Sequence, residues 1–102
     1  MSQVMNIVVI ATLDTKGEEA GFIRDRIAEK GHTPIVVDPG STGAPMIAAD
    51  VSREEVALAG GESLEAALSK KDKAYAQQRM TEGVVKLVSR LHAQGRLDGV
   101  IG

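Results

Sequence analysis

The chain has no cysteine and no tryptophan, and it has only one phenylalanine and one tyrosine among its 102 residues. Without cysteine, disulfide bridges, thiol catalysis and cysteine-based zinc sites are excluded. Aromatic residues make up 2% of the chain and apolar residues 43%, so we expect a core built mainly from Ala, Val and Ile. Such a core favours a compact α/β or all-α domain over a β-sandwich rich in aromatic residues.

Strong charge of one sign and long apolar runs are also missing. The formal net charge is −2, which disfavours a general nucleic-acid binder because such proteins usually carry a basic face. The longest apolar stretch, residues 4–11, is too short to span a bilayer and lacks the basic segment that begins a signal peptide. We therefore expect a cytoplasmic protein with no membrane partner, and the length suits one small domain.

Strand and helix patterns alternate along the first third of the chain. Residues 4–11 are nearly all apolar, which is typical of a strand that is buried on both faces of a parallel sheet. A helix with a 3.6-residue period is predicted over residues 16–30, and a second apolar strand over 34–38. Together they predict a β-α-β unit, whose strands are parallel and joined by a right-handed crossover.

A long helical stretch separates the second strand from a third one, which is predicted at residues 98–102. A crossover needs only about a dozen residues, so the stretch contains an insertion. Its predicted helices lie at residues 53–59, 63–70 and 73–94. We predict one three-layer, Rossmann-like α/β domain over residues 1–102, with a parallel sheet in order 2-1-3, helices on both faces and a helical insertion over 44–72.

The turn between the first strand and the first helix is a candidate binding site. Thr15 and Glu18 have the spacing of a capping box, which predicts Thr15 as the N-cap residue. A helix start presents backbone N–H groups at the positive end of the helix dipole, and this arrangement attracts anions. Lys16 adds a cation, Gly17 leaves room beside the first turn, and Asp14 offers a partner for a metal ion or a hydroxyl group.

The loop after the second strand is expected at the same edge of the sheet, because ligands of open α/β sheets bind beyond the carboxyl ends of the strands. It begins with Asp38 and continues through Gly40 and Ser41. Asp38 stands about where dinucleotide-binding folds place a ribose-binding acid. An equally weighted alternative is that Asp38 only ends its strand and Thr15 only caps its helix. The glycine-rich fingerprints of NAD-binding folds and P-loop NTPases are absent.

Three short motifs occur in order along the chain. They are Ile-Ala-Thr-Leu-Asp-Thr-Lys-Gly-Glu-Glu at 10–19, Val-Val-Asp-Pro-Gly at 36–40 and Asp-Gly-Val-Ile-Gly at 98–102. Together they resemble the start of the Tm-1-like ATP-binding family, which is also grouped as an uncharacterised protein family and is related to a plant antiviral resistance protein. Members of that family are several times longer and have two Rossmann-like halves, so the resemblance implies an N-terminal fragment of a larger protein.

The resemblance implies a nucleotide ligand, ATP with Mg²⁺, and it implies binding more strongly than turnover because no general base stands out. One wall of the site is then expected at Thr12, Asp14, Thr15, Lys16 and Gly17. The other wall is expected at Asp38, Gly40 and Ser41, and the metal ligands stay open. The implied partners are the nucleotide and the remainder of a longer chain. The alternative is a non-catalytic scaffolding or oligomerisation module, for instance a homo-oligomer, that docks through residues 44–72.

Overall fold

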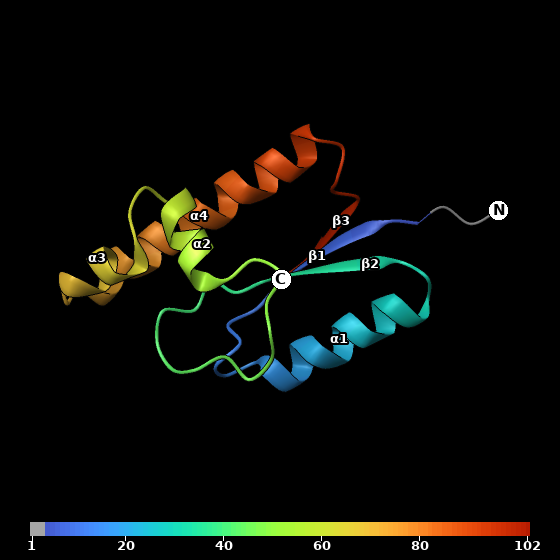
Figure 1. Ribbon diagram of the computed structural model, residues 1–102, viewed down its shortest axis with the longest axis horizontal. Helices are drawn as coiled ribbons and strands as arrows, with labels where there is room; N and C mark the ends of the chain where they lie inside the picture. The colour runs from blue at the N-terminus through green and yellow to red at the C-terminus, as the bar shows by residue number, and fades with distance from the viewer. Residues whose placement is uncertain (1–3) are drawn as a thin grey trace.

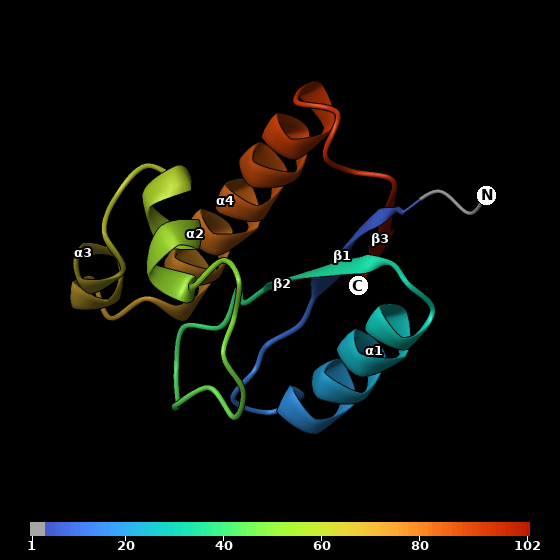
Figure 2. The same cartoon turned by 45° about the vertical axis from the view of Figure 1, so that its right-hand side comes forward.

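A computed structural model describes residues 4–102, which form a three-stranded parallel sheet in the order β2-β1-β3. The elements in chain order are β1 (Asn6–Ile10), α1 (Gly17–Glu29), β2 (Thr33–Val37), α2 (Arg53–Ala59), α3 (Leu64–Ser69), α4 (Lys73–Ala93) and β3 (Gly99–Ile101). Helix α1 covers one face of the sheet, and α2 and α4 lie on the other side (Figure 1, Figure 2). The predicted α/β class, strand order and placement of helices on both faces are confirmed.

Strand β1 is buried on both faces because successive side chains of a strand point to opposite faces of the sheet. Val8 belongs to a buried cluster with Val56 and Met80, from α2 and α4. Val9, the next residue, belongs to a second cluster with Ala20 of α1. The nearly continuous apolar sequence of this strand therefore follows from its position in the middle layer.

Glycine lets the helices α2 and α4 approach each other closely. A Cβ atom at Gly83 of α4 would collide with the backbone carbonyl of Val56 in α2. A Cβ atom at Gly60, just after α2, would likewise collide with the backbone carbonyl of Arg79 in α4. The second half of the 44–72 stretch thus packs against the domain's own long helix, while residues 44–51 form a loop beside β2.

The start of α1 differs from the prediction. Lys16, not Thr15, is the N-cap residue, and no side chain caps the helix. The Thr15 hydroxyl lies 3.0 Å from the Thr12 hydroxyl, in a turn where the N–H groups of residues 15 and 16 donate to the Thr12 carbonyl. Because this turn engages the hydroxyl before the helix begins, the capping box predicted at Thr15 is wrong. The same spacing does form a capping box at Ser52 and Glu55, where α2 starts.

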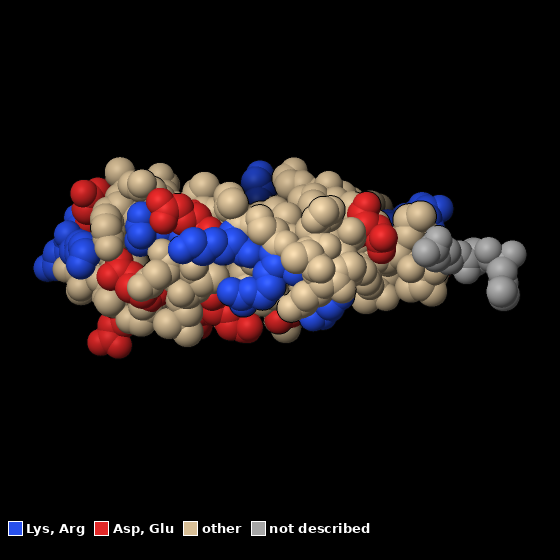
Figure 3. Space-filling model, turned by 90° about the horizontal axis from the view of Figure 1, so that it is seen from above, with Lys and Arg blue, Asp and Glu red and all other residues tan. Residues whose placement is uncertain are grey.

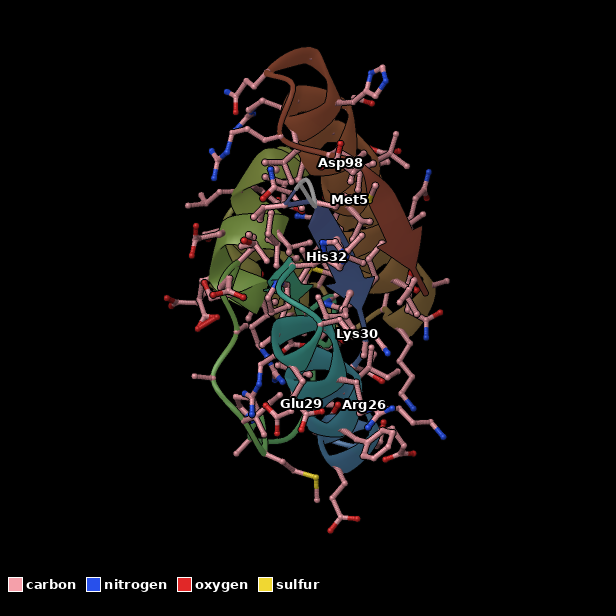
Figure 4. All side chains as sticks on the ribbon, turned by 90° about the vertical axis from the view of Figure 1, so that its right-hand side faces the viewer. Met5, Arg26, Glu29, Lys30, His32 and Asp98 are labelled. Atoms are coloured by element: carbon pink, nitrogen blue, oxygen red, sulfur yellow. The ribbon has the colours of Figure 1, made fainter. Side chains whose placement is uncertain are left out.

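Side chains tie together the amino ends of the strands. The Met5 N–H donates to Nδ1 of His32 at 3.1 Å, and the Asn6 N–H donates to Oδ2 of Asp98 at 2.7 Å. Figure 4 shows Asp98, Met5 and His32 following one another along this end of the sheet, next to the last turn of α1 at Lys30. These polar groups bond to the backbone of neighbouring segments, so this end of the sheet is a structural framework.

The single tyrosine, Tyr75, reports on the contact between the start of α4 and the loop that joins α2 to α3. Its hydroxyl donates to Oε1 of Glu62, and this hydrogen bond, with burial and the negative charge of Glu62, raises the pKa of Tyr75 above 10.0. We expect the tyrosinate absorbance to titrate with a midpoint above 10.0 and the E62Q variant to titrate at a lower pH. The matched control is E65Q, on the exposed side of α3, which should leave the midpoint unchanged. An unchanged midpoint in E62Q would contradict this assignment.

Candidate functional site

The two crossover connections run in opposite directions across the sheet, and the point where they diverge lies between β1 and β3. The chain leaves β1 through α1 and arrives at β2 on one side, and it then returns through α4 to β3 on the other side of β1. In open α/β sheets, the crevice outside the carboxyl ends of the strands at such a topological switch point is the usual ligand site. The carboxyl ends of β1 and β3 are therefore the first place to look for one.

An open cavity of about 490 Å³ lies at this point. We call it the switch-point cavity, and its lining consists of Val9, Ile10, Ala11, Thr12, Lys16, Glu19, Ala20, Ile23, Pro39, Ile101 and Gly102. Most of the lining is apolar, and the polar side chains come from the turn before α1 and from its first turn. Small-molecule sites are typically clefts of roughly 300–1,000 Å³ with an apolar lining and a few polar groups, so the cavity suits a ligand of that size.

Thr12 and Lys16 are the predicted site residues that the fold brings to the switch-point cavity. The Lys16 ammonium lies 3.7 Å from Oε2 of Glu19, and both side chains are mostly exposed. An exposed ion pair of this kind contributes only about 0–1 kcal/mol. The ammonium group is therefore held weakly and is free to turn toward an anion in the cavity.

Asp14 and Gly17 contact the segment that follows β2 and do not line the cavity. The Asp14 carboxylate accepts a long hydrogen bond, 3.4 Å, from the Thr42 hydroxyl. A Cβ atom at Gly17 would collide with the side chain of Met46, so glycine at this position lets the 44–51 loop pack on the start of α1. The room that Gly17 was predicted to leave is thus filled by the protein itself.

Asp38 is buried at the end of β2, and both of its carboxylate oxygens are bonded within the protein. Oδ2 accepts from Nε and Nη2 of Arg53 at 3.2 and 3.1 Å. Oδ1 accepts from the N–H groups of Leu13 and Gly40 at 3.3 and 2.9 Å. Asp38 therefore joins the turn after β1 to the loop after β2, and these bonds occupy the oxygens that a ribose would need.

Arg53 is the residue that sequence reasoning missed. Its Nη1 donates to the carbonyl oxygens of Thr42 and Gly43, so one guanidinium group holds both the Asp38 carboxylate and the loop after it. A signal was present in the sequence, since a cation in the first turn of a helix lies unfavourably in the helix dipole. An arginine directly after the N-cap Ser52 therefore indicates a specific partner outside the helix.

The remaining predicted residues lie elsewhere. Thr15 is bonded to Thr12, and Gly40 is buried beside Asp38. Ser41 lines a separate hollow of about 320 Å³ between the loop after β2 and the start of α4. The eight predicted residues are thus not gathered into one pocket, and the switch-point cavity contains two of them.

The surface carries both signs of charge. On the face drawn in Figure 3, basic and acidic side chains lie beside one another, mostly toward the end that carries α3. Within residues 4–102, no group of three or more His, Cys, Asp or Glu side chains is placed to hold a metal ion. In the same range, no helix has the length and apolar character needed to cross a membrane.

A parallel sheet wound in both directions, with a cavity at its switch point, places the domain in the open α/β class. The chain belongs to the uncharacterised protein family UPF0261, whose N-terminal domain matches residues 5–102. UPF0261 proteins of Clostridium tetani, Brucella suis and Rhizobium meliloti are 40%, 36% and 34% identical to it.

These three matches cover 93–94% of this chain and 23–24% of each relative, so the chain spans about a quarter of their length. No solved structure matches the chain. The match confirms the predicted resemblance to an uncharacterised protein family. The predicted link to the Tm-1-like family and to ATP binding stays a prediction.

Proposed function

We propose that this domain binds a nucleotide, ATP with Mg²⁺, in the switch-point cavity, as the N-terminal part of a larger Tm-1-like protein. The observation that carries the proposal is the position of Lys16 and Thr12 at a cavity between the carboxyl ends of β1 and β3. Open α/β folds bind nucleotides at this place because a helix start and two strand ends converge there.

The cavity residues suit the parts of a nucleotide. The side chains of Ile23 and Ile101, which line the cavity and are partly exposed, offer an apolar surface for a base. Because no side chain caps α1, the N–H groups of its first turn are left for an anion, and Lys16 adds a positive charge beside them. The negative charge of Glu19 at the same rim opposes an anion, and its ion pair with Lys16 would open when phosphate binds.

The site residues are better suited to a Mg²⁺ ion that enters together with the nucleotide than to a metal ion bound by the protein alone. Mg²⁺ usually keeps several waters and binds through one or two carboxylates together with substrate phosphates. No cluster of three ligating side chains is formed by residues 4–102. The Asp14 carboxylate accepts a hydrogen bond from Thr42 outside the cavity, so it would have to turn toward the cavity to contribute. Mg²⁺ would supply charge neutralisation for the phosphates. Binding, and not turnover, is proposed.

The K16A variant is expected to bind ATP–Mg²⁺ roughly ten- to a hundredfold more weakly, because a hydrogen bond to a charged group contributes roughly 1.5–3 kcal/mol. Isothermal titration calorimetry measures the change. The control is K30A, which removes the same charge at the other end of α1 and should bind as the unmodified chain does. Absence of any heat with the unmodified chain would contradict nucleotide binding by this domain, and equal affinities of K16A and K30A would contradict the role of Lys16.

A scaffolding module that docks through residues 44–72 is the second candidate. Leu58 of α2 and Leu68 of α3 favour it, because their side chains are 63% and 40% exposed. Size-exclusion chromatography with light scattering separates the candidates. A strict monomer that binds ATP supports the first, and an oligomer that an L58K/L68K variant dissociates supports the second.

A further inference from the structure

The sheet has one covered edge and one open edge. Along the outer edge of β2, Val51 forms a parallel bridge with Val37, and the Asp50 carboxylate accepts from the Val36 N–H at 2.7 Å. Beyond β3, residues 4–102 contribute no further strand. An open strand edge presents unpaired N–H and C=O groups that pair readily with another strand. The chain therefore protects β2 and leaves β3 ready for pairing.

The open strand β3 carries apolar side chains on both faces. Val100 pairs with Val8, which faces α4, and it is 48% exposed. Ile101 pairs with Val9, which faces α1, and it is 40% exposed. A strand at a permanent edge would gain from charged or polar residues, whereas apolar residues on both faces are typical of a strand inside a larger parallel sheet.

On the α4 side, the apolar surface continues from the strand to the helix. Gly83 faces α2, and Val85 lies about 200° further around the helix axis, on the flank away from α2. Val85 is 59% exposed and lines a hollow of about 390 Å³ together with Ile10 and Met80. One flank of α4 is thus covered by α2, and the opposite flank exposes the apolar side chain of Val85.

We propose that the edge of β3 and the free flank of α4 dock a β-strand and a helix from the part of the polypeptide that longer UPF0261 proteins carry outside the matched domain. The matched region makes up 23–24% of the relatives, so about three quarters of their length remains to supply this segment. The inference does not depend on nucleotide binding.

The right-handedness of crossovers decides which face of the sheet the docked helix covers. The step from β1 to β2 uses α1 on one face, and the step in the opposite direction, from β2 to β3, uses α4 on the other face. A right-handed crossover from β3 to a new strand on its open edge would run in the same direction as the crossover from β2 to β3. The helix of that new crossover would therefore lie on the same face as α4. That helix covers Val85 and Val100 and leaves the switch-point cavity, on the α1 face, accessible.

Maleimide labelling of single cysteines tests this docking, since residues 1–102 contain no cysteine. The variants V85C, V100C and F22C are made in this chain and at the aligned positions of the full-length Clostridium tetani relative, with any native cysteines of the relative replaced by serine. Phe22 is the control because its side chain is 68% exposed on α1. In residues 1–102 all three cysteines should react at similar rates. In the full-length relative, those aligned with Val85 and Val100 should react about tenfold or more slowly than the one aligned with Phe22.

Each other outcome overturns part or all of the proposal. Equal reaction of the three cysteines in the full-length relative overturns it entirely. Protection at the position of Val100 with free reaction at that of Val85 overturns the placement of the helix on the α4 face. Mass photometry is run at the labelling concentration, and protection that disappears when the protein is diluted to a monomer identifies a second copy, and not the same chain, as the occupant.

Discussion

The R53M variant is expected to lower the free energy of unfolding by about 3–5 kcal/mol, because it leaves the Asp38 carboxylate buried without its charged partner. The ion pair is well shielded, since the side chains of Asp38 and Arg53 are 2% and 11% exposed. The same arginine also bonds the carbonyl oxygens of the loop after β2, and these bonds are lost in the variant. Urea denaturation followed by circular dichroism measures the change in a chain without tryptophan.

Two variants make this result specific to the buried pair. In R24M the lost ion pair, Arg24 with Asp25 at 3.1 Å, lies on the surface, so a change within about 0.5 kcal/mol is expected. In the double variant D38N/R53M both charges are gone, and it should recover part of the stability that R53M loses. If R53M were no less stable than R24M, the buried ion pair would not be an important contact between β2 and α2.

The G83A variant is expected to lower the free energy of unfolding by about 2 kcal/mol, although helix propensity alone predicts a gain of about 1 kcal/mol. The added Cβ atom would overlap the backbone carbonyl of Val56, and a backbone atom cannot rotate away as a side chain can. The helices α2 and α4 would have to separate, which also loosens the packing of Met80 in the cluster beneath them. The measurement is the same urea denaturation.

The matched control is G21A in the middle of α1. A Cβ atom at Gly21 would have its nearest neighbours at 3.8 Å, which is ordinary van der Waals contact. Alanine should therefore show its helix propensity there and raise the free energy of unfolding by up to about 1 kcal/mol. If G83A were stabilised to the same extent as G21A, the close approach of α2 to α4 would be contradicted.

The two helix starts with capping-box spacing show how far local sequence can be trusted. Ser52 caps α2, and the observed helix begins and ends at the predicted residues. At the first helix, Thr15 has the same spacing, but a turn around Thr12 bonds its hydroxyl and Lys16 becomes the N-cap. A spacing rule describes one helix end in isolation, and it fails where a competing local bond forms first.

The amino-acid sequence is enough to predict the α/β class, the strand order and nearly all of the helices and strands, because apolar periodicity and crossover handedness act locally or as general rules. Which polar residues are bonded inside the protein and which line the cavity follows only from the way the elements pack. Asp38 meets Arg53 across 15 positions of sequence, and Gly83 meets α2 across a longer separation that includes helix α3. Such contacts depend on how finished elements pack, so Lys16 and Thr12 reach the switch-point cavity while Asp38 is committed to the interior.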